Sequence, residues 1–324
     1  MRRHGPIAIG LLLLAAGAGL AGGTGGAVAA GARTQLVFAS SGHLWAVSPQ
    51  GRGLHPFARI PENTNDISAS ESGRRVAIIS HAPLRYPRQG SIRTIYLWRY
   101  GHPGLRRLLR IHTVADSSVA ISPDGRLIAY GRENEIWMMR ADGSHRQRVT
   151  QGSRRAFDPA FSPSGKNLFF VRQSMNAGTN RIYRKPFTTP YHSEVGLTPP
   201  GADDHSPVVS SRHTVAFIQL GEGRRGAVTP DRLRVMDPDG HNPRTVTRSN
   251  DPRFNLYPDF SPSGRSISYV RLREVNGDRS PRRYSLRTIR TSGKNPRVAV
   301  GHLRARPRGL QWTLVPGPPG PGRG

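Results

Sequence analysis

The sequence predicts an all-β protein: a six-bladed β-propeller of four-stranded antiparallel blades, with the ring closed by a C-terminal strand in the N-terminal blade. Three observations lead to this fold class. A Ser-Pro-x-Gly turn followed by an alternating apolar strand recurs along the chain. An aromatic or aliphatic strand that ends in a second turn follows each copy. The last segment can supply the strand that the first unit lacks, and a period of about 40 to 50 residues is typical of propeller blades.

The turn repeat defines the first two strands of each blade. Its copies align on Gly73, Gly125, Gly165 and Gly264, with His213 standing in for one glycine, at spacings of 52, 40, 48 and 51 residues. Proline fixes φ at the first central turn position, and glycine accepts the positive φ that closes a tight hairpin. Alternating strands flank the turn, as a blade requires.

The later strands recur as well. A third strand reads HLWAV at 43–47, IWMM at 136–139 and LRVM at 233–236, and a short fourth strand follows each turn. The sequence contains six such third strands. The repeat that starts at Leu36, however, lacks a first strand followed by a Ser-Pro-x-Gly turn. The segment 307–314, PRGLQWTL, is predicted to fill that place and so remove the open sheet edge. Trp312 then takes the position of Phe161 and Phe260.

The ends of the chain differ in composition from the repeats. Residues 1–32 combine Arg2 and Arg3, an apolar run at 7–21 and an Ala-x-Ala sequence at 27–29, which is the layout of a secretory signal peptide. Retention of this segment as an uncleaved anchor stays an alternative. Residues 33–315 are the predicted propeller domain, which we expect to be secreted, periplasmic or in the cell envelope. Residues 316–324, PGPPGPGRG, are predicted to form a disordered tail.

Composition excludes several kinds of site. The chain has no cysteine, which rules out disulfides, thiolate zinc sites and a catalytic thiol. The net charge is +28, and 45 of the 48 basic residues are arginine because only three are lysine. Such a surface can serve an anionic partner or reflect GC-rich coding, and both interpretations stay open. We expect no nucleic-acid partner, because an exported chain rarely meets one and no run interleaves aromatic with basic residues.

The F-S-P-x-G turn, the aromatic third strand and the Asp-Gly turn together resemble the WD-like repeat of the TolB family of six-bladed β-propellers. The resemblance covers residues 36–314. It implies a non-catalytic binding platform. Because Leu36 already begins a blade, we expect no counterpart of the α/β domain that precedes the propeller in TolB. A serine-peptidase role is not expected either, since no Gly-x-Ser-x-Gly sequence occurs.

The predicted binding site lies on one face of the ring. Antiparallel strands place both tight turns of a blade on one face, and the longer connections on the other. Loops on a rigid scaffold commonly carry function, so we expect binding of a protein or an anionic cell-envelope polymer on the face with the long loops. These loops are rich in arginine and include Tyr86 between prolines. The candidate binding residues are Arg85, Tyr86, Arg88, Arg93, Arg154, Arg155, Arg273, Arg282, Arg283 and Arg306.

Several other residues receive structural interpretations. Trp45, Trp98 and Trp137 recur at one strand position, which favours a core role between blades. The aspartates of the second turns are interpreted as hairpin residues, since the further ligands of a calcium loop are missing. A third group of aspartates precedes the first strands and is predicted to fix where each blade begins. The turn aspartates are Asp142, Asp237 and Asp239, and the aspartates before first strands are Asp66, Asp116, Asp158 and Asp203.

We expect no catalytic activity, no cofactor, no bound metal and a monomeric chain. The alternative is a metal-dependent lyase acting on acidic oligosaccharides. That chemistry would need histidines to converge at the mouth of the ring, and His112, His205 and His302 are the candidates.

Overall fold

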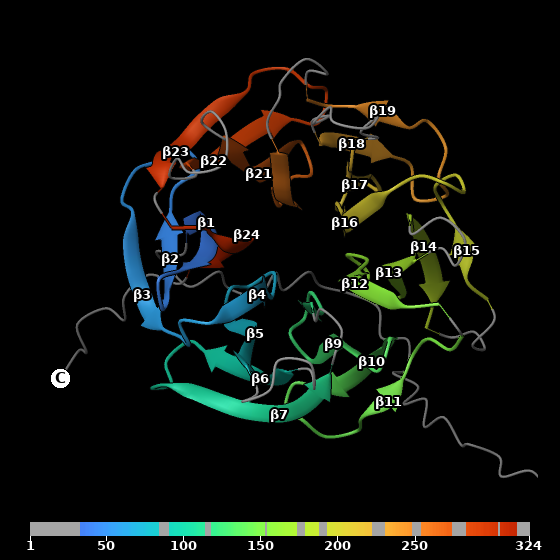
Figure 1. Ribbon diagram of the computed structural model, residues 1–324. Helices are drawn as coiled ribbons and strands as arrows, with labels where there is room; N and C mark the ends of the chain where they lie inside the picture. The colour runs from blue at the N-terminus through green and yellow to red at the C-terminus, as the bar shows by residue number, and fades with distance from the viewer. Residues whose placement is uncertain are drawn as a thin grey trace, which may run out of the picture.

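The computed structural model describes residues 33–83, 91–113, 118–152, 154–173, 179–187, 193–221, 231–247, 254–273, 283–303 and 305–315. They form a ring of six four-stranded antiparallel sheets (Figure 1), and the innermost strands line a central channel. The predicted fold class is therefore confirmed. Within these ranges no helix is long and apolar enough to cross a membrane.

Blades A to C are named from the N-terminus, and their strands are given from the channel outward. Blade A contains β24 (Arg308–Val315), β1 (Arg33–Ser40), β2 (His43–Val47) and β3 (His55–Arg59). Blade B contains β4 (Thr64–Ala69), β5 (Arg75–Pro83), β6 (Ser91–Arg99) and β7 (Leu105–Thr113). Blade C contains β8 (Val119–Ile121), β9 (Leu127–Arg132), β10 (Glu135–Arg140) and β11 (Gln147–Arg148).

Blades D to F repeat the same order. Blade D contains β12 (Ala156–Phe161), β13 (Asn167–Gln173), β14 (Asn180–Pro186) and β15 (Val195–Gly196). Blade E contains β16 (Asp204–Val209), β17 (Val215–Gln219), β18 (Arg232–Met236) and β19 (Arg244–Thr245). Blade F contains β20 (Phe254–Phe260), β21 (Ser266–Arg273), β22 (Arg283–Arg290) and β23 (Arg297–Leu303).

The ring closes through the last strand, as predicted. Strand β24 pairs antiparallel with β1, with Arg33 opposite Val315, and takes the innermost place in blade A. The buried Thr313 hydroxyl also donates to the carbonyl oxygen of Ser70 in blade B at 2.8 Å. The C-terminal strand thus joins the N-terminal blade to its neighbour.

The Ser-Pro-x-Gly turns show why serine recurs with glycine. The glycine N–H donates to the serine carbonyl, and the serine hydroxyl accepts from the backbone N–H that starts the second strand, as when Asn167 donates to Ser162 at 3.0 Å. Gly165 has φ of 67° and lies in the left-handed region. His213 replaces glycine with φ of 56°, so it adopts the same turn at a steric cost.

The core consists of apolar clusters between neighbouring blades. One cluster joins Leu36 and Phe38 of blade A to Val270 and Leu286 of blade F, and similar clusters lie between the other neighbouring pairs. The tryptophans predicted to lie in the core pack partly buried against these clusters. They are Trp45, Trp98 and Trp137.

The two faces of the ring have different connections, as predicted. The Ser-Pro-x-Gly turns of blades B to F and the connections between third and fourth strands lie on what we call the short-turn face, whereas the two-residue turns at 41–42 in blade A and 133–134 in blade C lie on the opposite face. The innermost strands begin on the opposite face, which we call the long-loop face. Several strands extend further into the predicted loops than expected: β5 continues to Pro83, β6 begins at Ser91 and β23 continues to Leu303. The connections are therefore shorter than the sequence pattern indicated.

Candidate functional site

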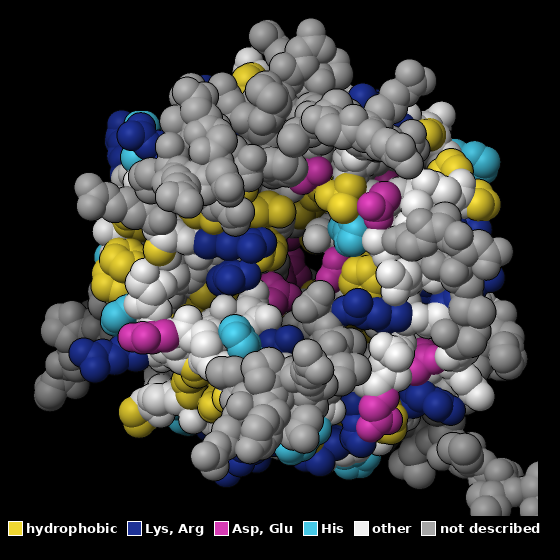
Figure 2. All heavy atoms as spheres, in the orientation of Figure 1, with side chains coloured by type: hydrophobic (Ala, Val, Ile, Leu, Met, Phe, Trp, Pro, Cys, Tyr) yellow, Lys and Arg dark blue, Asp and Glu magenta, His cyan; other side chains and the backbone are white. Residues whose placement is uncertain are grey.

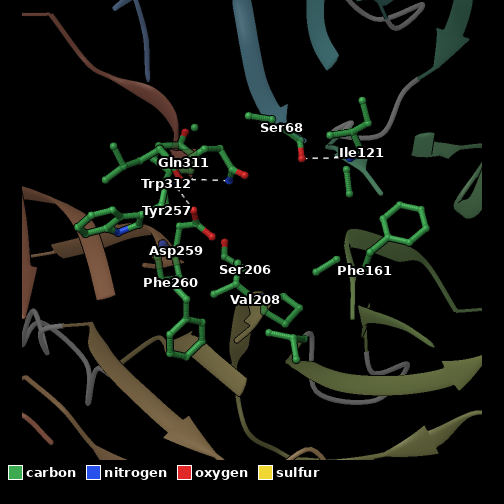
Figure 3. A pocket seen from close by; sticks show the side chains of 18 of the residues that line it. Ser68, Ile121, Phe161, Ser206, Val208, Tyr257, Asp259, Phe260, Gln311 and Trp312 are labelled. Atoms are coloured by element: carbon green, nitrogen blue, oxygen red, sulfur yellow. Dashed lines mark hydrogen bonds between the residues drawn. The ribbon is translucent and has the colours of Figure 1, made fainter. Parts of the chain in front are cut away.

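The central channel forms a cavity of about 250 Å³ lined by the innermost strands of all six blades (Figure 3). Its lining is unusual for a chain of net charge +28, because three aspartates contribute to it. They are Asp66 of β4, Asp158 of β12 and Asp259 of β20. From the long-loop face, acidic side chains are visible inside the central opening and basic side chains flank it (Figure 2).

Bulges in the innermost strands aim these side chains. In blades D, E and F the register shifts within the strand pair, and Asp158, Ser206 and Tyr257 have positive φ values of 49°, 51° and 51°. A proline follows each of the three residues. Proline has no N–H to donate, so it is tolerated at a bulge where the ladder is interrupted. The sequence therefore encodes the bulges as an x-Pro pair at equivalent positions.

Hydrogen bonds link neighbouring blades around the channel. The Asp66 carboxylate accepts from the Val119 N–H at 3.3 Å, the Ser118 hydroxyl accepts from the Asp158 N–H at 2.8 Å, and the Asp158 carboxylate accepts from the Ser206 N–H at 3.1 Å. These contacts give Asp66 and Asp158 the structural role that the sequence predicted. Asp116 lies outside the described residues.

Blade A meets blade B at this ring through a glycine. Gly309 has φ of 58°, and a Cβ there would lie 2.9 Å from the Asp66 Oδ1 atom and 2.8 Å from the Ile67 side chain. Only a residue without a side chain lets β24 approach β4 so closely. The Gly309 position therefore sets the width of the ring at its closure.

Burial changes the acidity of the channel carboxyls. Desolvation raises the pKa of Asp66 from 3.8 to about 7, and the nearby charge of Asp158 adds to the increase. Desolvation also raises the pKa of Asp259 from 3.8 to about 7. Asp259 and Ser206 extend into the same part of the channel (Figure 3). The channel therefore gains negative charge as the pH rises through neutrality.

The channel mouth also contains a histidine and aromatic side chains. His205 Nε2 lies 3.0 Å from Asp203 Oδ1, and the Asn180 amide donates to the same Asp203 oxygen at 2.6 Å. The Phe157 ring lies 5.8 Å from the His205 ring, and the Arg155 guanidinium lies over Phe157 at 5.0 Å. Arg155, a predicted binding residue, is thus fixed by an aromatic contact beside the mouth.

The predicted binding arginines occupy different places. Arg154, Arg283 and Arg306 are exposed on the long-loop side, in the connection before β12, at the start of β22 and in the connection before β24. Arg306 lies near the channel: burial raises the pKa of the Tyr257 phenol, and the charges of Arg306 and Arg308 oppose that increase. The structure thus brings cations from blades D, F and A to one face.

Of the remaining predicted binding residues, only Arg93 and Arg273 lie within the described ranges. Arg93 belongs to strand β6 and not to a loop, and only 8% of it is exposed. Its guanidinium lies 3.2 Å from the side-chain oxygen of Asn65 when that amide is oriented to satisfy its neighbours. Arg273 ends strand β21, and its side chain is not described. Arg85, Tyr86, Arg88 and Arg282 lie outside the described residues.

The histidines of the lyase alternative do not converge. His205 lies in the innermost strand of blade E, but His112 lies in the outermost strand β7 of blade B and His302 in the outermost strand β23 of blade F. Among the described residues, no three His, Asp or Glu side chains gather in a way that could hold a metal ion. Within the described ranges, the residues therefore do not form the metal site that this chemistry needs.

A buried ionic network on the same side was not predicted. The Arg172 guanidinium donates to both oxygens of Glu194 at 2.7 and 2.8 Å, and lies 3.8 Å from Glu135 in blade C. It also donates to the Arg154 carbonyl oxygen at 2.6 Å, which fixes the backbone that presents the exposed Arg154. The only sequence signal for this network is a pair of opposite charges on apolar strands: Arg172 near the end of one strand and Glu135 at the start of another.

Comparison with known proteins supports the same fold. No family model matches the chain. The chain is 41% identical over 64 residues to the Tol-Pal system protein TolB of Thioalkalivibrio sulfidiphilus, a stretch that is 20% of this chain and only 14% of that protein. The crystal structure of TolB from Acinetobacter baumannii matches with a TM-score of 0.63 and 16% identity, over 87% of this chain and 66% of that one.

Other solved propellers are similar at lower identity. A chain of a nidogen/laminin complex matches with a TM-score of 0.65 and 12% identity, over 87% of this chain and 99% of that one. An oligogalacturonate lyase from Vibrio parahaemolyticus matches with a TM-score of 0.51 and 12% identity, over 73% of this chain and 70% of that one. At such identities the similarity concerns the fold. In its repeat, its closing strand and its architecture, the chain therefore carries a six-bladed, TolB-like β-propeller.

Proposed function

We propose that this chain is a non-catalytic, extracytoplasmic binding protein whose long-loop face engages an anionic protein or cell-envelope polymer. The observation that carries the proposal is the set of exposed arginines on the long-loop face, Arg154 and Arg306 before innermost strands and Arg283 at the start of β22. Arg155 beside Phe157 adds a cation next to an apolar surface. The similarity to TolB proteins and to a propeller in a protein complex supports a binding role.

The rigid ring makes the arrangement selective. The Arg154 backbone is held by the buried Arg172, so the exposed guanidinium is displayed without ordering a loop on binding. A basic residue near an anionic surface contributes about 1 kcal/mol, and contributions of this kind weaken over a Debye length of about 8 Å at physiological salt. An anionic partner that spans the mouth would contact all three arginines at once.

The test is binding of the full chain to a purified, lipid-free cell-envelope polymer and protein fraction at low and high salt, so that binding to lipid does not contribute. Replacing Arg154, Arg283 and Arg306 together by glutamine should weaken binding by about 10- to 100-fold at low salt and remove most of its salt dependence. The matched control replaces Arg74, Arg126 and Arg265 on the short-turn face, which removes the same charge. Unchanged binding of the first variant, or equal loss in both, would refute a site on the long-loop face.

A metal-dependent lyase is not supported as a second function. The similar fold of the oligogalacturonate lyase is the observation in its favour, but the separation of His112, His205 and His302 opposes it. Metal analysis of the purified protein gives a direct test. Stoichiometric manganese or another divalent metal, lost on His205→Ala, would restore the lyase as a candidate.

A further inference from the structure

The short-turn face carries a repeated set of exposed cations that the proposed binding site does not use. In each of blades B to F a basic residue stands next to the turn glycine, or next to His213 in its place. The five residues are Arg74, Arg126, Lys166, Arg212 and Arg265, and all are exposed. Because the turns occupy equivalent positions in successive blades, these side chains form an arc around the exit of the channel. Blade A adds Arg52 in its second turn, also exposed.

The acids of this face do not cancel the arc. Three further exposed cations lie at the second turns: Arg140, Arg290 and Lys294. The acids on the turns of this face are Glu71, Asp124, Asp142, Asp237 and Asp239. Several of these acids hold their own turn. Asp142 accepts from the Ser144 N–H at 2.9 Å, and Asp239 accepts from the His241 N–H at 3.0 Å. Nine cations therefore stand against five acids on these turns, and the face is positive.

Apolar side chains exposed to water lie on the outer edge of the ring, toward the same face. Among the described residues the exposed large hydrophobic side chains are Leu54, Val195 and Val298, at 40%, 47% and 50% exposure. Leu54 lies just before β3, Val195 begins β15 and Val298 is the second residue of β23, so all three lie on the outer edge of the ring, in the half of each blade nearer the short-turn face. A single exposed apolar residue is ordinary, but three at the rim of one basic face match a surface that meets lipid headgroups with cations and apolar side chains together.

The path of the chain leads to the same side. Strand β1 begins at Arg33 and β24 ends at Val315, and these paired residues lie at the short-turn end of blade A. The apolar run at 7–21 is separated from Arg33 by residues 22–32, which can span at most about 40 Å when fully extended. Where the segment is retained as an uncleaved anchor, its link to the ring starts at the short-turn end of blade A.

We propose that the short-turn face docks on an anionic lipid bilayer and leaves the long-loop face directed away from it. The cations supply attraction to acidic headgroups, and Leu54, Val195 and Val298 enter the headgroup region. This surface is separate from the proposed binding site, so either can fail without the other.

Vesicles test the proposal with the full chain. Binding to vesicles of phosphatidylglycerol and phosphatidylcholine is compared with binding to phosphatidylcholine alone. Replacing Arg74, Arg126 and Arg265 by glutamine should lower the anionic-vesicle partition coefficient by on the order of 100-fold, about fivefold per residue. These side chains make no buried contact, so folding is preserved. The control variant with Arg154, Arg283 and Arg306 replaced should bind as the unmodified chain does.

Orientation is measured with a fluorophore, because the chain has no cysteine of its own. An environment-sensitive label on Val298→Cys should shift to shorter wavelength on anionic vesicles, and one on Ala305→Cys at the long-loop face should not. A shift at Ala305 alone, or full binding of the short-turn variant, would overturn the proposal. A second combination of results would also overturn it. The chain would bind soluble polyglutamate as tightly as anionic vesicles, and the Leu54→Ser/Val298→Ser variant would bind vesicles as the unmodified chain does. The short-turn face would then bind an anionic polymer and not a bilayer.

Discussion

Asp259→Asn should stabilise the ring at alkaline pH. Asp259 lies in the channel wall, where desolvation raises its pKa from 3.8 to about 7. Its carboxylate accepts the Trp312 N–H at 2.5 Å, and an asparagine oxygen can accept the same hydrogen bond. The substitution therefore removes the ionisable group while keeping the contact that joins blade F to blade A.

The sign follows from the raised pKa. Between pH 3.8 and about 7 the folded chain holds the Asp259 proton that the unfolded chain has already lost, so stability falls as the pH rises through this window. The difference between 3.8 and about 7 corresponds to a ceiling of about 4 kcal/mol above the folded pKa. Because Asp259 is half-buried and the channel can admit water, we expect about 1 to 2 kcal/mol for Asp259→Asn at about pH 8, and little change near pH 4.

Urea unfolding followed by tryptophan fluorescence measures this directly across the pH range. Asp142→Asn is the control, since hydrogen bonds from Ser144 hold the pKa of that exposed carboxyl below its usual value and the substitution should lower stability at neutral pH. A stability gain of Asp259→Asn that is the same at pH 4 and at pH 8 would refute the electrostatic explanation. A loss at pH 8 would show that the charged carboxylate is needed in the channel.

Three further predictions concern the fold. Arg172→Met should lower stability by about 3 to 5 kcal/mol, measured by urea unfolding, because two buried glutamates lose their cation. Gly165→Ala should lower the free energy of unfolding by about 1 kcal/mol through its φ of 67° alone, since nothing lies within 4 Å of the added Cβ. His213→Gly, at the equivalent turn position, should raise it by about 0.5 to 1 kcal/mol. Melting temperatures equal to that of the unmodified chain would contradict both expectations. Thr313→Val should cost about 1 kcal/mol, because the Ser70 carbonyl loses one of its two donors and keeps the Gly73 N–H, and an unchanged stability would show that water replaces the hydroxyl.

The repeat made most of the fold predictable. Turn chemistry is local, so Ser162 to Gly165 and its copies indicate a hairpin wherever they occur, and Trp312 in register with Phe161 was enough to identify the closing strand. Strand ends were less predictable, because β5 and β6 stay paired with each other as far as Pro83 and Ser91. Pairing partners distant in the sequence decide where such strands end.

The site was harder to predict than the fold. Exposed arginines at Arg154 and Arg306 follow from their place between strands, but Arg93 is buried because it lies within strand β6 and not in the loop that the sequence predicts. Asp259 looks like an ordinary residue before the turn in the sequence. Its raised pKa arises only when six strands surround it and exclude water, which is a property of the closed ring.

The pairing of β1 with β24 also determines how the ring responds to force. Arg33 and Val315 are opposite each other, so tension between the two chain ends loads the β1–β24 hydrogen bonds one after another, as a zipper opens, and does not shear them all together. The closure should then be the mechanically weakest joint of the molecule when both ends are pulled apart. Pulling from one end and from a distant blade would instead load several blades in series and should require a larger force.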